Sequence, residues 1–160
     1  MSAKSLQVTT PTDREIVMTR LFDAPRQLVF DAHTKPELVQ RWLLGPPGWT
    51  MPVCEIDLRV GGKYRYEWHH PEKRSFGTGG VYREIAAPER IVHTELMDGA
   101  PAEALITFVL SEQDGKTTLT QTMHLASREL RDMVIKTGMA KGVEASYANL
   151  DRVLAAASRA

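Results

Sequence analysis

The chain has 160 residues, and its 20 Lys or Arg balance its 20 Asp or Glu, so the formal net charge is zero with neutral His. This length predicts one domain with enough core to fold unaided, and the single cysteine, Cys54, excludes an internal disulfide. A neutral chain without a basic block is a poor candidate for binding nucleic acid or an anionic membrane, so we expect neither partner.

The N-terminal residues are polar and lack the apolar stretch of a signal peptide, and no apolar run is long enough to span a membrane. We therefore expect a cytoplasmic location. Residues 1–13 are expected to form a flexible tail and residues 14–158 a single domain.

The domain begins with a strand and two short helices. Residues 15–22 alternate in the manner of a strand, with apolar side chains on both faces. The apolar spacing then becomes helical, and Lys35-Pro36 divides the helical stretch into two short helices. The Gly-Pro-Pro-Gly sequence at 45–48 predicts a rigid loop.

Residues 50–125 have the pattern of consecutive hairpins, with Gly-rich or Pro-containing turns between the strands. The clearest alternation is at 63–69, which places Tyr64, Tyr66 and Trp68 on one face. Asp114-Gly115 is a strong hairpin signal. Six strands are expected here, at residues 50–58, 63–69, 76–85, 90–97, 104–110 and 117–125.

The C-terminal segment predicts a short helix capped by Ser127, a break near Gly138 and a long helix from about Met139 to Ala157. One apolar stripe follows the long helix. The predicted fold class is α+β, with a curved antiparallel sheet of about seven strands wrapped on this helix and two short helices after the first strand.

A single helix that covers one curved sheet tends to enclose a cavity, and an aromatic sheet face suits a flat or amphipathic small molecule. The alternative is that the same rings simply fill the core. The residues expected to line a cavity for a small hydrophobic molecule are Trp42, Trp49, Tyr64, Tyr66, Trp68, Tyr82, Phe108, Met123, Met139, Val143 and Tyr147.

Several segments in order resemble the SRPBCC superfamily, the START and birch-pollen-allergen-like group, and in particular its branch homologous to the activator of the heat-shock-protein-ninety ATPase. They are residues 20–32, 36–42, 45–50, 55–64, 80–85 and 88–92. The resemblance implies a helix-grip fold with a deep hydrophobic cavity and supplies no shared catalytic residues. In this branch a Trp commonly stands near the position of Val143, so its absence suggests extra room at this end.

No hydrolase, phosphate-loop, dinucleotide or metal-chelating motif is present, and we expect no metal and no cofactor. Acid–base chemistry could use Glu67 with His69, or His93 with Glu95, because each pair lies two residues apart on one strand face. The first pair lies opposite the aromatic face and would point to solvent. The weak catalytic candidates are Glu67, His69, His93 and Gln121.

Three hypotheses for function follow. The favoured one is binding of a small hydrophobic or aromatic ligand in the cavity. The second is a cyclase-, aromatase- or hydrolase-like enzyme that uses the same cavity. The third is an interaction module like the chaperone activator. An exposed apolar rim would also be compatible with a homodimer.

Overall fold

The computed structural model describes residues 5–159, which form eight strands and four helices. In chain order the elements are β1 (Gln7–Thr9), β2 (Glu15–Phe22), α1 (Arg26–Thr34), α2 (Pro36–Trp42), β3 (Thr50–Ile56), β4 (Lys63–His70), β5 (Lys73–Ala86), β6 (Arg90–Met97), β7 (Ala104–Gln113), β8 (Lys116–His124), α3 (Arg128–Lys136) and α4 (Met139–Arg159).

All strands join one antiparallel sheet in the order β1-β2-β8-β7-β6-β5-β4-β3. The helix-grip fold and α+β class are therefore confirmed, although the sheet has one strand more than expected. The additional strand is β1, which pairs with β2 through Val8 and Met18 and lies within the expected flexible tail. Residues 1–4 of the expected tail lie outside the described residues.

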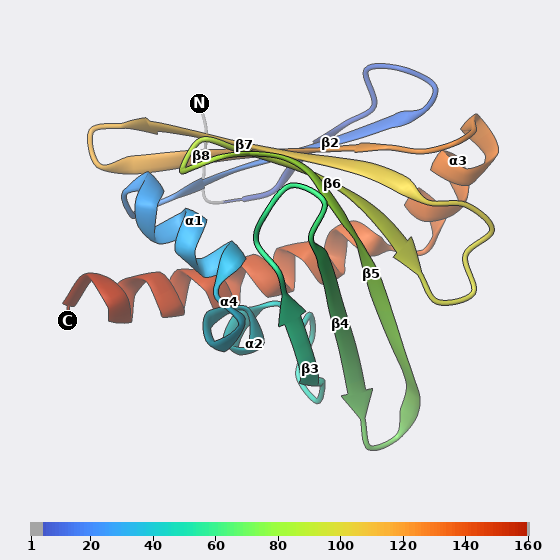
Figure 1. The fold of residues 1–160 in the computed structure, drawn as a ribbon, viewed down its shortest axis with the longest axis horizontal. Coiled ribbons are helices and arrows are strands. Elements are labelled where there is room, and N and C mark those ends of the chain that lie inside the picture. Colours follow the sequence, from blue (N-terminus) through green and yellow to red (C-terminus); the bar gives the residue numbers. More distant parts are fainter. Residues whose placement is uncertain (1–4, 160) are drawn as a thin grey trace.

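The long helix α4 crosses the sheet on one side, next to α1 and α2 (Figure 1). Its C-terminal half is bound tightly, because Leu150 and Leu154 are buried in the main hydrophobic cluster, which also includes Tyr147 near the middle of the helix. Complete burial of such a side chain contributes about 2 kcal/mol. The ring of Phe22 on β2 meets the ring of Tyr147 edge to face, with centroids 5.2 Å apart.

An ion pair fixes the same half of α4 to β2. Arg20 is only 4% exposed, and its guanidinium donates to both carboxylate oxygens of Asp151 at 2.7 Å each. The guanidinium also lies 4.7 Å from the centroid of the Phe22 ring. A bidentate contact of this kind fixes direction as well as distance, so α4 has one orientation across the sheet.

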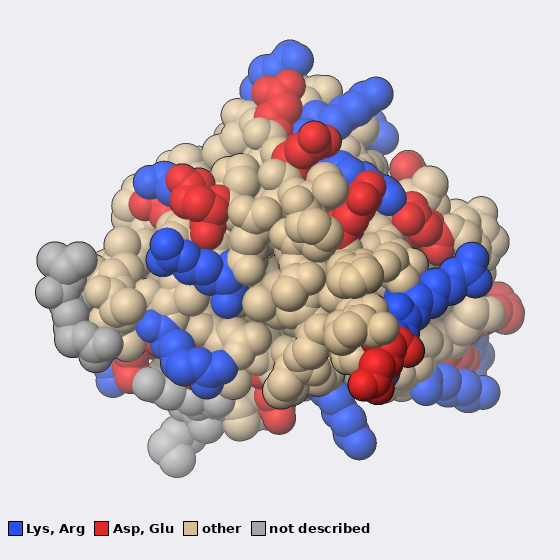
Figure 2. Space-filling model, turned by 90° about the horizontal axis from the view of Figure 1, so that it is seen from below, with Lys and Arg blue, Asp and Glu red and all other residues tan. Residues whose placement is uncertain are grey.

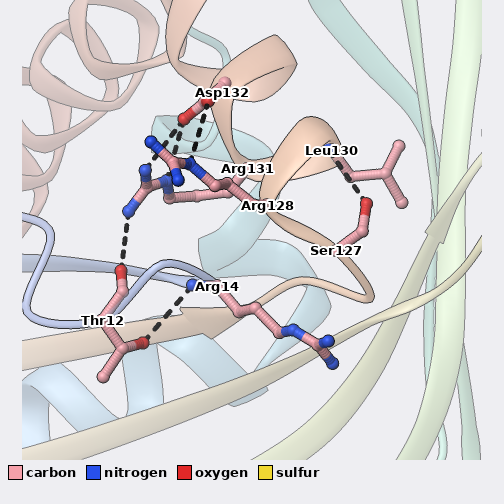
Figure 3. Close-up of polar contacts among 7 residues, drawn as sticks. All are labelled: Thr12, Arg14, Ser127, Arg128, Leu130, Arg131 and Asp132. Atoms are coloured by element: carbon pink, nitrogen blue, oxygen red, sulfur yellow. Dashed lines mark hydrogen bonds and ion pairs between the residues drawn. The ribbon is translucent and has the colours of Figure 1, made fainter.

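The N-terminal end of α4 is set by α3 and by the turn between the two helices. Gly138 has φ of +76°, a conformation that favours glycine, and it separates α3 from α4 at the expected break. Ser127 caps α3 by accepting from the Leu130 N–H at 3.1 Å, and Arg131 donates to the Thr12 carbonyl at 2.6 Å (Figure 3). The predicted cap at Ser127 is confirmed.

The sheet bends where β5 meets β6. A Cβ at Gly80 would lie 2.0 Å from the Thr94 carbonyl oxygen, so a side chain here would push the two strands apart. The register of this pair also shifts between Tyr82 and Glu84. A close backbone approach followed by an irregularity is a common way to curve a sheet, and here it turns β3 to β5 around the side of α4.

Among the described residues, no helix is long and apolar enough to cross a membrane. The face seen from below in Figure 2 has its Lys, Arg, Asp and Glu side chains around a central area of uncharged residues. Charge on this face is thus peripheral.

We expect Asp151→Asn to lower the free energy of unfolding by about 3 kcal/mol, because it leaves the buried Arg20 without a counter-charge. Asp151 is 31% exposed, which places the effect at the lower end of the range for such pairs. Urea denaturation measures it. The exposed Glu144→Gln on the same helix is the matched control, with a change below about 0.5 kcal/mol. An equal loss in both variants would contradict the proposed role of the ion pair.

Candidate functional site

A cavity of about 380 Å³ lies under the N-terminal half of α4. Its walls come from α4, α2, the loop that follows α2, and the inward face of β4 to β8, with a contribution from the end of α1. Ten of the residues expected to line it do so: Trp42, Trp49, Tyr66, Trp68, Tyr82, Phe108, Met123, Met139, Val143 and Tyr147.

Tyr64 is the exception. Its ring lies deeper in the sheet-side core, against Tyr66, Tyr82 and His93 at centroid distances of 5.0, 5.6 and 4.8 Å. Its hydroxyl donates to the Thr94 carbonyl at 2.8 Å. Tyr64 thus supports the wall of the cavity but does not line it.

The cavity exists because α4 presents small side chains where it would otherwise reach the sheet. Val143 is half-buried and bridges the two hydrophobic clusters without filling the space between them. Gly142 also lines the cavity, and a Cβ built there meets no atom within 4 Å. The room suggested by the missing Trp is therefore present at this position.

The loop after α2 closes one side of the cavity and is held at two points. The indole N–H of Trp68 donates to the Leu43 carbonyl at 2.7 Å. The N–H of Gly45 donates to the hydroxyl of Ser146 on α4 at 2.8 Å. Because the loop is tied to both β4 and α4, its position depends on the same helix that roofs the cavity.

Aromatic rings form much of the lining. Trp68 stacks on Phe76 with centroids 5.0 Å apart, and Tyr66 meets Trp68 at 6.0 Å. Trp49 reaches the same group from the loop, with its ring 5.3 Å from that of Phe76. Such a wall suits a flat or apolar molecule.

Two histidines bring polar atoms to this lining. His33 Nδ1 lies 2.8 Å from the Val29 carbonyl, and His93 Nδ1 lies 2.8 Å from the Thr94 carbonyl. A carbonyl can only accept, so each Nδ1 carries the proton and each Nε2 is left as an acceptor. Burial lowers the pKa of His33 to about 4 and also lowers the pKa of His93, so both rings are neutral near pH 7.

The Nε2 atom of His33 is buried and has no hydrogen-bond partner among the described residues. The Thr78 hydroxyl on β5 is also buried and also lacks a hydrogen-bond partner among the described residues. An unpaired buried polar atom costs about 1–3 kcal/mol, so these two atoms favour a molecule that can pair with them.

Glu95 is the carboxyl group of the cavity. It follows His93 by two residues on the inward face of β6 and is half-buried. Loss of water around the carboxylate raises its pKa from 4.5 to about 7. Gln121 on β8 also lines the cavity and accepts from the Tyr147 hydroxyl at 3.3 Å.

The other two catalytic candidates lie away from the cavity. Glu67 accepts from the Nε of Arg65, 3.1 Å away, and His69 is exposed beside the hydroxyl of Ser75 at 3.0 Å. Neither lines the cavity, as the alternation in β4 predicts for the face opposite its aromatic side chains. Of the weak candidates, only His93 and Gln121 reach it.

Sequence reasoning missed His33 and Thr78 as lining residues. His33 lies one turn after Val29 on the buried side of α1, a position that apolar spacing alone cannot assign to a cavity. Thr78 alternates with Phe76 along β5, which was a usable signal. Among residues 5–159, no group of three His, Cys, Asp or Glu side chains is placed to hold a metal ion.

Comparison with known proteins identifies the family. Residues 23–155 match the family model described as Activator of Hsp90 ATPase homolog 1-like protein. The chain belongs to this family. The resemblance to the SRPBCC superfamily is thereby confirmed, and the fold is of a type that serves as a ligand-binding or Hsp90 ATPase-activator-like domain. No curated protein matches the chain.

Solved structures of similar proteins have the same fold. A Rhodobacter sphaeroides protein is 33% identical, with a TM-score of 0.90 over 95% of this chain and 99% of that one. A Staphylococcus epidermidis protein is 26% identical, with a TM-score of 0.80 over 92% and 93%. The AHSA1-like protein from Aeromonas hydrophila is 17% identical, with a TM-score of 0.71 over 87% and 93%, and this likeness concerns the fold alone.

Glu95 should make stability depend on pH. Its pKa is higher in the folded chain, so it favours folding at low pH, and this contribution is lost as pH rises from 4.5 to about 7. The lowered pKa of His33 has the opposite effect, because it makes stability rise with pH below pH 6.5. We therefore compare wild type with Glu95→Gln, since the contribution of His33 is the same in both and cancels in the difference.

We expect the stability of Glu95→Gln relative to wild type to rise across this interval and to level off above it. Urea denaturation in a series of buffers measures this difference. A difference that does not change with pH would show that the carboxyl is as well hydrated in the folded chain as in the unfolded one.

Proposed function

We propose that this protein binds a small hydrophobic or aromatic molecule in the cavity between α4 and the sheet. The observation that carries the proposal is the cavity itself, about 380 Å³ in volume and lined largely by aromatic and aliphatic side chains. Unfilled apolar volume in a core destabilises the folded chain, so a ligand that fills a cavity of this size stabilises it.

The polar atoms of the lining agree with a bound molecule. His33 Nε2 and the Thr78 hydroxyl are buried and unpaired among the described residues. A purely structural cavity gains nothing from such atoms, whereas a ligand that carries a polar group would satisfy them. The ligand therefore combines an apolar body with at least one polar group.

The binding test uses N-phenylnaphthylamine, an uncharged fluorescent probe for apolar sites. We expect saturable binding to wild type and a loss of affinity of about tenfold or more in Val143→Trp, because the indole occupies the cavity. Ala148→Trp is the matched control, because Ala148 is exposed on the same helix. It should bind as wild type does.

Val143→Leu supplies a smaller filling of the same site and keeps the test valid if the Trp variant folds poorly. It should give an intermediate loss of affinity. Wild type that does not bind the probe, or a Val143→Trp variant that folds and binds equally well, would refute the proposal.

A second candidate function is catalysis in the same cavity, and the placement of His93 and Glu95 on one face favours it. A carboxyl with pKa near 7 beside a neutral imidazole can give and take protons at neutral pH. If a bound compound is converted, Glu95→Gln should abolish turnover and still bind N-phenylnaphthylamine. Turnover unchanged in this variant would remove these residues as the acid and base.

The chaperone-activator hypothesis rests on the description of the family alone. The cavity supports the ligand-binding proposal more directly.

A further inference from the structure

The only charge that the described lining of the cavity can carry near pH 7 is negative. No Lys or Arg lies among the described residues that line it, and both of its histidines are neutral near pH 7. Glu95 is thus the one lining side chain, among those described, that can carry a net charge at neutral pH. It has no hydrogen-bond or ion-pair partner in the described part of the chain.

The two neutral histidines of the lining both present hydrogen-bond acceptors. His33 and His93 each use the Nδ1 proton on a backbone carbonyl, which leaves two Nε2 acceptors. Aromatic rings lie close to them: the Phe108 ring centroid is 5.3 Å from that of His33 and 5.7 Å from that of His93. Aromatic rings can attract cations. A carboxylate, two imidazole acceptors and these rings together complement a group that is positively charged and rich in N–H donors.

We propose that the ligand of this cavity is a small organic cation, an arylalkyl amine, whose ammonium group pairs with the Glu95 carboxylate while its apolar part contacts the aromatic wall. This inference rests on the proposed function and names the chemical class of the ligand. It disfavours fatty acids and other carboxylates, because the described lining holds no cation to pair with them.

The dependence on pH follows from the groups that face Glu95. Burial raises the pKa of the tyrosines among them and lowers the pKa of both histidines, so these groups keep their neutral form from about pH 6.5 to pH 8.5. Only the Glu95 carboxyl changes charge in this range. The facing titratable groups are His33 on α1, Tyr64 and Tyr66 on β4, Tyr82 on β5, His93 on β6 and Tyr147 on α4.

The test compares three probes of similar size that differ in one group: phenethylamine, phenethyl alcohol and hydrocinnamate. Isothermal titration calorimetry, or competition against N-phenylnaphthylamine, gives their affinities. At about pH 8.5 we expect the amine to bind about tenfold more tightly than the alcohol, and the carboxylate to bind most weakly. Lowering the pH to about 6.5 should weaken only the amine, which stays protonated throughout.

Glu95→Gln should bind the amine and the alcohol within about twofold of each other, and it should retain affinity for N-phenylnaphthylamine. Glu144→Gln removes an exposed carboxylate from α4 and should keep the wild-type preference. Equal binding of amine and alcohol by wild type, or a preference that persists in Glu95→Gln, would overturn the inference.

Failure of this inference and failure of the proposed function are distinguishable. Binding of N-phenylnaphthylamine without a preference for the amine would overturn the organic-cation assignment and leave a ligand-binding cavity. If neither the neutral probe nor any of the three compounds binds, both proposals fall together.

Discussion

The structure depends on how α4 is held against the sheet. Its C-terminal half is fixed by the bidentate contact between Arg20 and Asp151 and by the complete burial of Leu150. A straight helix fixed at one half cannot bring its other half closer to a bent sheet without breaking these contacts. Since Gly142 and Val143 are small, the space under the N-terminal half is left open.

The same geometry explains the chemistry of the cavity. The polar side chains at its wall lose much of their water to the aromatic lining and the helix, and this desolvation is the main cause of their pKa shifts. It keeps His33 and His93 neutral and raises the pKa of Glu95. An apolar cavity with unpaired acceptors is costly for an empty fold and suited to a ligand that supplies donors. The unpaired atoms, His33 Nε2 and the Thr78 hydroxyl, thus lower the stability of the ligand-free chain and favour binding of a ligand.

Much of this could be predicted from sequence, because alternation and helical spacing report which side chains share a face. The strict alternation around Tyr66 and the apolar stripe of α4 placed the two walls of the cavity correctly. How deeply a side chain is buried was harder to predict, since alternation gives the face on which Tyr64 lies but not its burial under neighbouring rings. Strand β1 is short, and its three residues are exposed, so only its pairing with β2 reveals it. The depth of His33 likewise depends on where α1 packs.

The central claim is that a molecule lies under the N-terminal half of α4. A crystal structure of the protein in complex with N-phenylnaphthylamine tests it most directly. The account predicts density for the probe between Val143 and Trp68, with α4 still held by the ion pair of Arg20 and Asp151. Density for the probe only on the outer surface, with the cavity closed by the protein's own side chains, would contradict it.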